Sequence, residues 1–177
     1  MDQRVYLHVG VHKSGTPHLQ SRMARSGAAL REQGVLYPAA GSQMFLSAVD
    51  VRDTCRAWGL RRRDVRGSWD RLCRTARHHD GVTVISHELF AGAAPRQVVA
   101  AMTMLRGVDV HVVVSTPDQE HPTTVETVNR WGRAVPPSRL HVLCAPTGPT
   151  GHPQLWQDFA DLVGFDPART APRATID

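Results

Sequence analysis

Short apolar runs alternate along the chain with longer stretches in which apolar residues recur every three or four positions. The runs are typical of strands buried on both faces, and the stretches are typical of amphipathic helices. The sequence predicts strands at residues 5–9, 35–38, 82–85, 108–114 and 140–144. It predicts helices at residues 17–30, 42–58, 64–78, 95–105, 124–131 and 153–163. This order predicts an α/β fold with three α/β/α layers, in which helices cover both faces of a central parallel sheet.

The length of the chain predicts a single domain. A chain of 177 residues, 41% of them hydrophobic, can bury a core without disulfides or a structural metal. The domain is expected to cover residues 1–165, and residues 166–177, rich in Pro, Arg and Thr, are expected to form a loose tail. The sequence contains no apolar run of the roughly 20 residues that span a membrane and does not start with an apolar leader. A cytoplasmic protein is therefore expected.

The most informative stretch is the loop Gly10-Val11-His12-Lys13-Ser14-Gly15-Thr16, between the first strand and the first helix. Thr16 is expected to cap that helix and Pro17 to take its first position. Free backbone N–H groups at a helix N-terminus attract anions, and Lys13, the only lysine of the chain, adds a full charge. Ser14 and Thr16 would add hydroxyl donors. The lysine precedes the second glycine, unlike in the GxxxxGK[ST] motif, which disfavours a nucleoside triphosphatase.

Residues 6–16, followed by Leu19-Gln20 and by residues 34–38, resemble the opening of bacterial sulfotransferase-family proteins, in which the loop is approximately H-K-[TS]-G-T-T. Weaker similarity extends over residues 84–89, 110–114 and 129–142. The resemblance implies a sulfotransferase-type fold, related to that of P-loop nucleotide-binding proteins. It also implies the co-substrate 3′-phosphoadenosine 5′-phosphosulfate. The residues implied in binding this donor are His12, Lys13, Ser14, Gly15, Thr16 and Ser115.

Sulfuryl transfer to a hydroxyl requires positioning of the reactants, neutralisation of developing charge and removal of a proton. Lys13 would neutralise the leaving phosphate. Glu88, just after the third predicted strand, is the first candidate for the general base, with His87 and His12 as rivals. No metal is expected. The acceptor would be a hydroxyl of an unknown small molecule, carbohydrate or lipid.

The carboxyl edge of the predicted sheet should gather the candidate residues, because ligands of parallel sheets bind beyond the carboxyl ends of the strands. The loops at residues 10–16, 86–88 and 115–118 are expected to converge there. His8 and His111 alternate with apolar residues within their strands and are expected to be core histidines instead.

Two departures from the family pattern keep other functions open. The family usually has an arginine after its fourth strand that helps to hold the 3′-phosphate of the donor, and this chain has Pro117 there. The segment 119–127 is short where the family has a long helical region that shapes the acceptor site. A non-catalytic relative that binds a nucleotide or a partner, and a small kinase in which Asp118 binds a metal, are the alternatives. Arg130 and Arg133 are candidates to replace the missing arginine.

Composition narrows the range of partners only slightly. The net charge of +5 and the isoelectric point of about 9.8 favour anionic ligands in general. The densest basic run, Arg61-Arg62-Arg63, is expected to be a solvated surface, so a nucleic acid is not the expected partner. Cys55, Cys73 and Cys144 have no metal-ligand spacing and are expected to be reduced thiols. Nothing in the sequence indicates the oligomeric state.

Overall fold

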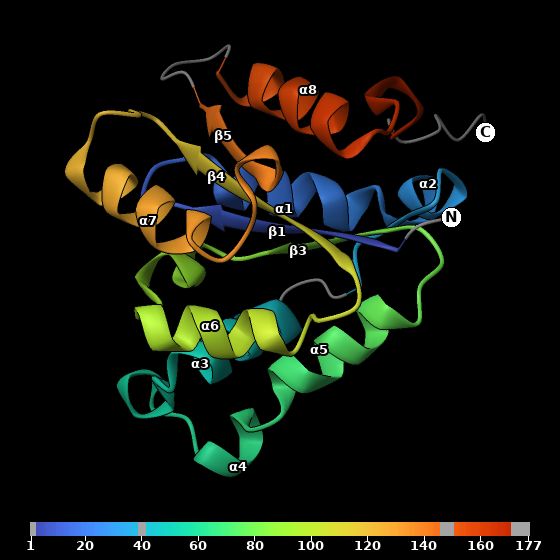
Figure 1. The fold of residues 1–177 in the computed structure, drawn as a ribbon. Coiled ribbons are helices and arrows are strands. Elements are labelled where there is room, and N and C mark those ends of the chain that lie inside the picture. The colour runs from blue at the N-terminus through green and yellow to red at the C-terminus, as the bar shows by residue number, and fades with distance from the viewer. Residues whose placement is uncertain (1–2, 39–41, 146–150, 171–177) are drawn as a thin grey trace.

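The fold is built on a five-stranded parallel sheet, seen in a computed structural model that describes residues 3–38, 42–145 and 151–170 (Figure 1). The strands are β1 (Arg4–Gly10), β2 (Val35–Leu36), β3 (Val82–Ser86), β4 (Asp109–Thr116) and β5 (Leu140–Cys144). Their order across the sheet is β2-β3-β1-β4-β5, and every neighbouring pair is parallel. The first strand therefore lies at the centre. The predicted α/β fold with a central parallel sheet is confirmed.

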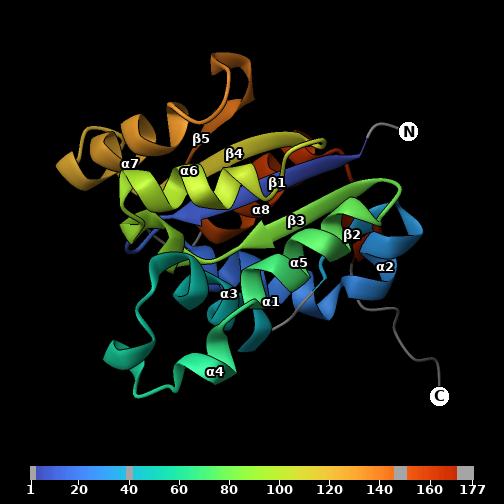
Figure 2. The ribbon, with the colours of Figure 1, turned by 60° about the horizontal axis from the view of Figure 1, so that its bottom comes forward.

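Helices cover both faces of the sheet (Figure 1), and a view turned by 60° shows the same layering (Figure 2). One face carries α1 (Thr16–Arg25), α2 (Gly27–Glu32) and α8 (Gly151–Val163). The other carries α3 (Ser42–Arg52), α5 (Ser68–Arg77), α6 (Pro95–Thr103) and α7 (Pro122–Gly132), and the short helix α4 (Arg62–Val65) projects beyond this layer. Short 3-10 turns complete the chain: η1 (Cys55–Trp58), η2 (Glu88–Gly92), η3 (Pro137–Arg139) and η4 (Pro167–Thr170).

Each face of the sheet packs into its own core, because successive side chains of a strand point to opposite faces. Val5, Leu7 and Val9 of β1 lie in the core shared with α3, α5, α6 and α7. Tyr6 lies in the core shared with α1 and α8, where its hydroxyl donates to the backbone oxygen of Leu162 at 2.9 Å. Since both faces are buried, the strands need apolar residues at nearly every position, which explains the continuous apolar runs of the sequence.

Two of the predicted helices are interrupted by residues with left-handed backbone. The helix predicted at 42–58 ends as α3, because Asp53 has a φ of 52°, and η1 follows it. The helix predicted at 64–78 is divided into α4 and α5 by Gly67, whose φ is 80°. A residue with positive φ cannot continue a right-handed helix. The apolar spacing did not predict these breaks because inward-facing residues continue on both sides of them.

The first helix differs from its prediction at both ends. The helix predicted at 17–30 is divided into α1 and α2, which are separated at Ser26. The prediction that Thr16 caps α1 is wrong, because the N-cap residue is Gly15. Thr16 and Pro17 are instead the first two residues of the helix, which frees the Thr16 hydroxyl for the contacts described below.

The chain after α8 is held against α2. The N–H of Asp166 donates to the side-chain oxygen of Gln33 at 2.8 Å, and the Ser26 hydroxyl donates to the backbone oxygen of Thr170 at 3.1 Å. Residues 166–170 therefore have defined contacts with the domain, and residues 171–177 lie outside the described residues. Residues 146–150 also lie outside the described residues, and α8 begins at Gly151 instead of residue 153.

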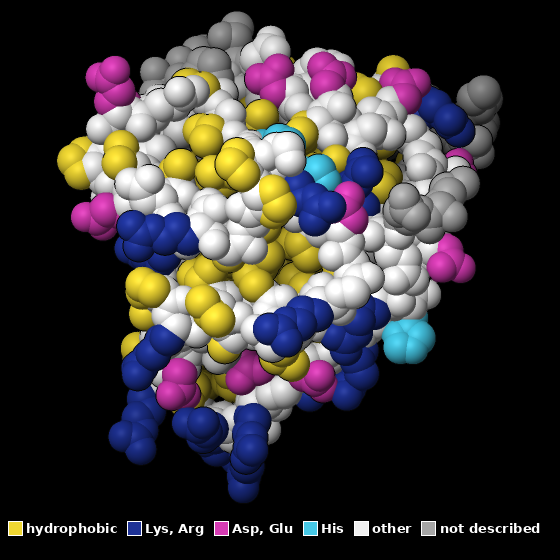
Figure 3. All heavy atoms as spheres, viewed as in Figure 1, with side chains coloured by type: hydrophobic (Ala, Val, Ile, Leu, Met, Phe, Trp, Pro, Cys, Tyr) yellow, Lys and Arg dark blue, Asp and Glu magenta, His cyan; other side chains and the backbone are white. Residues whose placement is uncertain are grey.

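The basic run lies on the surface of the projecting helix α4, where Figure 3 shows dark blue side chains gathered at the lower end of the molecule. Arg61 pairs with Asp64 at 2.6 Å, and Arg62 pairs with Asp53 at 3.1 Å. These pairs offset part of the positive charge, which agrees with a solvated surface. Among the helices of the described residues, none is both long enough and apolar enough to cross a membrane.

Candidate functional site

The loop between β1 and α1 is tightly wound at the carboxyl edge of the central strand. Lys13 has a φ of 62° and Gly15 a φ of 76°, both in the left-handed region. Glycine adopts this region freely, but a lysine is strained there. The side chains of His12 and Lys13 are exposed. The loop therefore holds a lysine in a strained conformation and presents its charge to solvent at the centre of the sheet.

Gly10, the last residue of β1, makes this winding possible. A Cβ atom at Gly10 would lie 1.6 Å from Thr16 Oγ1 and 2.7 Å from Ser14 Oγ. A Cβ atom at Gly15 would lie 2.6 Å from Leu155 Cδ2 of α8. Two glycines thus allow the loop to fold back over the end of β1 and against α8.

Backbone N–H groups of the loop are available to a ligand. The N–H of Val11 donates to the Ser115 backbone oxygen at 3.0 Å, and the N–H of Ser14 donates to the Val11 oxygen at 3.2 Å. Within residues 3–38, 42–145 and 151–170, no acceptor is bonded to the N–H groups of His12, Lys13, Gly15 and Thr16. Together with the positive end of α1 and with the Lys13 ammonium, these donors favour an anion.

The three predicted loops converge, because β1 lies between β3 and β4 in parallel register. His8 of β1 is aligned with Ser86 of β3, and Gly10 with Ser115 of β4. The loops that leave these strands therefore begin at the same edge of the sheet. The predicted convergence of the three loops at the carboxyl edge of the sheet is confirmed for the strand ends from which they leave.

A buried chain of polar side chains runs beneath the loop. His8 Nδ1 is 2.8 Å from Ser86 Oγ, and His8 Nε2 is 2.7 Å from Ser115 Oγ. Ser115 Oγ donates to Ser14 Oγ at 2.9 Å, and Ser14 Oγ is 2.9 Å from Thr16 Oγ1. All five side chains are buried. The hydroxyls of Ser14 and Thr16, expected to face a ligand directly, are therefore engaged with each other and with β4.

His8 is neutral at physiological pH. Its side chain is 0% exposed, and burial lowers its pKa from 6.5 to about 3. A neutral imidazole has one donor and one acceptor nitrogen, and both are used here by serine hydroxyls. His111 also has two partners, His141 at 2.8 Å and Asp109 at 3.2 Å. The two histidines are satisfied within the sheet, as the sequence predicts.

The residues after β3 differ in what they can do chemically. His87 Nδ1 accepts a hydrogen bond from the N–H of Leu89 at 3.1 Å, and burial lowers the pKa of His87. A neutral His87 then carries its hydrogen on Nε2, which makes that nitrogen a donor and disfavours His87 as a base. Glu88 is exposed, and no hydrogen bond or ion pair from the part of the chain that the structure describes reaches its carboxylate. Its position after β3 is as predicted, but no partner orients it.

The end of β4 is organised by backbone contacts. Pro117 follows the strand directly and has no N–H to donate. The hydroxyls of Thr116 and Thr124 donate to the backbone oxygen of Asp118 at 2.7 and 2.8 Å. The Asp118 carboxylate accepts the N–H of Glu120 at 2.9 Å. Asp118 thus stabilises the turn before α7.

The two arginines considered as substitutes for the missing arginine are placed differently. Arg130 Nη1 donates to the backbone oxygens of Ala91 at 2.8 Å and Ala93 at 3.2 Å. Arg130 therefore holds the turn that precedes α6. Arg133, at the end of α7, is exposed.

A cavity of about 330 Å³ lies between α1, α3 and the end of β3. It is lined by Gln20, Ser21, Ala24, Tyr37, Met44 and His87. Gln20 is fixed there because its Nε2 donates to the Ser86 backbone oxygen at 2.7 Å. Burial raises the pKa of Tyr37 to about 12, so its phenol stays protonated. The sequence marked Gln20 and Tyr37 only as members of the stretches that resemble the family.

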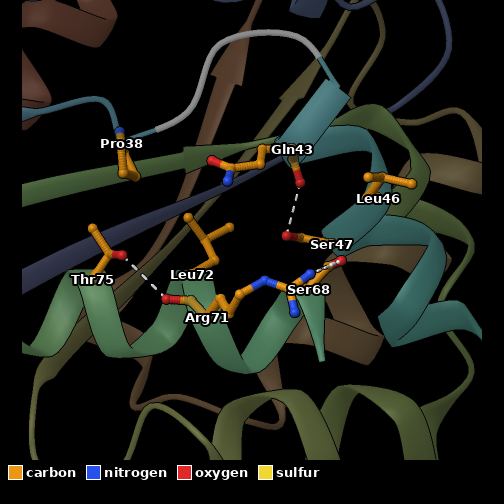
Figure 4. A pocket seen from close by; sticks show the side chains of 8 residues that line it. All are labelled: Pro38, Gln43, Leu46, Ser47, Ser68, Arg71, Leu72 and Thr75. Atoms are coloured by element: carbon orange, nitrogen blue, oxygen red, sulfur yellow. Dashed lines mark hydrogen bonds between the residues drawn. The ribbon is translucent and has the colours of Figure 1, made fainter. Parts of the chain in front are cut away.

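Other hollows of the surface offer less chemistry. In a cavity of about 170 Å³ between α3 and α5 (Figure 4), the three hydroxyls are already paired. Those of Ser47 and Thr75 donate to the backbone oxygens of Gln43 and Arg71, and that of Ser68 accepts from Arg71 Nη2. An open groove of about 310 Å³ between α6 and α7 is largely apolar (Figure 3). Neither of them adjoins the candidate loop.

Side chains that could bind a metal are scattered in this structure. No group of three or more His, Cys, Asp or Glu side chains within the described ranges is arranged to hold a metal ion. Cys55 and Cys73 are buried and Cys144 is exposed, and none of the three is in a disulfide.

Comparisons of the chain with protein-family models, with curated proteins and with solved structures found no match. Any functional conclusion therefore depends on the geometry of the loop and on the sequence resemblance described above.

Proposed function

We propose that the loop Gly10 to Thr16 binds the 5′-phosphosulfate end of 3′-phosphoadenosine 5′-phosphosulfate and that the protein transfers the sulfuryl group to an acceptor hydroxyl. The observation that carries the proposal is the tightly wound loop at the end of the central strand, with Lys13 exposed beside unbonded backbone N–H groups. A site of this kind suits an anion with several oxygens, because many donors point to one small volume. The sequence resemblance selects the sulfated nucleotide among such anions.

The proposed reaction assigns a distinct task to each residue. The acceptor oxygen forms a bond to sulfur as the bond between sulfur and the bridging phosphate oxygen breaks, which leaves adenosine 3′,5′-diphosphate. Lys13 offsets the charge that develops on the bridging oxygen. The proton of the acceptor hydroxyl passes to a base, for which Glu88 and His12 are the candidates because both are exposed at this edge. The cavity beside Gln20 and His87 is the proposed place for the acceptor.

One observation favours a second candidate function, in which the protein binds a nucleotide or a partner without turnover. The 3′-phosphate would lie near the end of β4, where Pro117 has no donor and Arg130 is bonded elsewhere. The third candidate, a small kinase, requires a carboxylate for magnesium. Asp118 already accepts a backbone N–H, which weakens that candidate.

The experiment that tests the proposal is calorimetric titration with adenosine 3′,5′-diphosphate and with ATP, each with and without magnesium. Lys13→Ala is the test variant. Arg106→Ala is the matched control, because Arg106 is an exposed cation just before β4, at the opposite edge of the sheet. Tighter binding of the 3′-phosphorylated nucleotide, weakened about tenfold or more in Lys13→Ala and unchanged in the control, supports the proposal.

Three outcomes would contradict the proposal in different ways. Magnesium-dependent binding of ATP would indicate the kinase. Binding of the 3′-phosphorylated nucleotide without turnover in a screen of hydroxyl acceptors would indicate the binding module. Absence of binding of either nucleotide would remove the nucleotide site altogether.

A further inference from the structure

The buried chain beneath the loop has a fixed direction. Ser115 Oγ donates to Ser14 Oγ, so the single hydrogen of the Ser115 hydroxyl is used on the side of the loop. The contact of 2.7 Å between Ser115 Oγ and His8 Nε2 therefore needs its hydrogen from the imidazole. Since His8 is buried and neutral, its other nitrogen, Nδ1, accepts from the Ser86 hydroxyl at 2.8 Å. Each hydrogen bond in this row of side chains is thus donated in the same direction, from β3, through β1 and β4, toward the loop.

Counting the hydrogens shows that one of them has no acceptor within this row of side chains. Ser86, His8, Ser115, Ser14 and Thr16 each contribute one hydrogen, and four hydrogen bonds join the five groups. One hydrogen is therefore in excess. Because the donors point toward the loop, the excess hydrogen belongs to Ser14 or Thr16, whichever of the two accepts in their contact of 2.9 Å. No acceptor for it exists among the residues that the structure describes.

That hydrogen belongs to the same loop as the candidate anion site. Thr16 Oγ1 and Ser14 Oγ lie directly over Gly10, inside the winding of the loop. The unbonded N–H groups of Gly15 and Thr16 belong to the same turn. With the opposite tautomer of His8, every donor would point back toward β3, and no hydroxyl hydrogen of the loop would be left for a ligand.

We propose that His8 is a positioning residue for the anion site, because it directs, through Ser115, the excess hydroxyl hydrogen of the loop toward the oxygen of a bound phosphate or sulfuryl group. The inference rests on the proposed function in one respect only, namely that the loop binds such an anion. It assigns a role in ligand binding to a histidine that touches no ligand and that the sequence predicts only as a core residue.

The first test is the tautomer of His8, which is measured on the wild-type protein from long-range ¹H–¹⁵N correlations of the imidazole. The expected result is a hydrogen on Nε2 and none on Nδ1, in the absence and in the presence of inorganic pyrophosphate. A hydrogen on Nδ1 in either state would overturn the inference. This test needs no variant, so it does not depend on whether a substituted protein folds.

The second test measures the affinity for inorganic pyrophosphate in variants of the chain. Ser115→Ala removes the link between His8 and the loop and is expected to weaken binding about tenfold, as for the loss of a hydrogen bond to a charged group. Ser115→Thr keeps the hydroxyl and is expected to restore most of the affinity. Thr83→Val is the matched control, because Thr83 is a fully buried residue of β3 whose hydroxyl has no partner among the described residues.

The outcomes separate this inference from the proposed function. Wild-type affinity in Ser115→Ala, an equal loss in Thr83→Val, or no binding of pyrophosphate by the wild-type protein would each overturn the role of His8. If pyrophosphate binds as expected but adenosine 3′,5′-diphosphate has no advantage over ATP, the proposed sulfuryl transfer is wrong and the role of His8 is upheld.

Discussion

The hydroxyl oxygen of Thr16 occupies the space that a side chain at Gly10 would need, only 1.6 Å from the place of a Cβ atom. Gly10→Ala is therefore expected to push the loop away from β1. The cost in unfolding free energy should be about 1 to 3 kcal/mol, as in other overpacked sites, and anion binding should be lost. Thermal or urea unfolding and a pyrophosphate titration would measure the two effects.

Gly27→Ala is the control for that variant. A Cβ atom at Gly27 meets nothing within 4 Å, and the residue lies in α2, where alanine is favoured over glycine. The control should be as stable as the wild-type protein or more stable by up to about 1 kcal/mol. If Gly10→Ala behaved like Gly27→Ala, the described packing of the loop would be wrong.

The strained backbone at Lys13 predicts that two substitutions, by glycine and by alanine, differ in their effect on stability but not in their effect on binding. Lys13→Gly removes the side chain at a φ of 62°, so it should raise the unfolding free energy above that of Lys13→Ala by up to about 1 kcal/mol. Both variants should bind anions equally weakly, because both lack the ammonium. Urea unfolding of Lys13→Gly and Lys13→Ala at one pH would compare their unfolding free energies. Equal values would show that the backbone at residue 13 is not strained.

Acid should destabilise the protein through His8. Burial lowers the pKa of His8 to about 3 in the folded protein, whereas in the unfolded chain it stays at its ordinary value of 6.5. The unfolded chain then binds more protons between these two values. The unfolding free energy therefore has its full value, as far as His8 is concerned, above pH 6.5, and it decreases progressively as the pH falls toward 3.

Between pH 7.5 and pH 5.5, the expected loss from this one group is on the order of 1 kcal/mol. Urea unfolding of the wild-type protein and of His8→Asn at both pH values isolates the contribution of His8 to the unfolding free energy, because asparagine does not titrate. His18, His87 and His141 also have lowered pKa values, through burial above all, and they act in the same direction in both proteins. Equal losses in the two proteins would contradict the buried, neutral state of His8.

Arg130 should matter for stability and not for the nucleotide. Arg130→Ala leaves the backbone oxygens of Ala91 and Ala93 without their donor and should lower the unfolding free energy by about 1 to 3 kcal/mol. Arg133→Ala, at an exposed site, should change it by less than about 0.5 kcal/mol. Affinity for adenosine 3′,5′-diphosphate should be unchanged in the folded fraction of both. A selective loss of affinity in Arg130→Ala would instead place Arg130 at the 3′-phosphate.

The strands β1, β2, β3 and β4 could be predicted from the sequence because most of their residues are buried, which leaves a continuous apolar signal. The helix breaks at Asp53 and Gly67 could not, since they depend on a left-handed backbone that the apolar spacing does not record. The predicted strands at 82–85 and 108–114 also end before Ser86 and Ser115, which belong to β3 and β4. Ser86 and Ser115 are tolerated in the buried sheet only because each has a hydrogen-bond partner on β1, about 80 or more residues away in the chain.

The location of the candidate site was predictable, but the orientation of its groups was not. The glycines and the lysine of the loop indicate an anion site by residue type alone. Whether the hydroxyls of Ser14 and Thr16 face a ligand or the protein depends on contacts with Ser115, which no local pattern contains. For the same reason, His87 was placed among the candidate bases, although its acceptor nitrogen is bonded to the Leu89 N–H.

The central place of β1 also has a consequence for how the chain folds. β1 is synthesised before the other four strands, yet the two partners of its His8 side chain lie 78 and 107 residues further along the chain. A parallel sheet with such distant pairings folds slowly, because long segments of chain must be closed before the pairing energy is gained. On the ribosome, the apolar strand β1 has both of its neighbours, β3 and β4, only once β4 has emerged. A nascent or truncated chain that ends before β4 therefore has an exposed aggregation-prone strand and no formed loop.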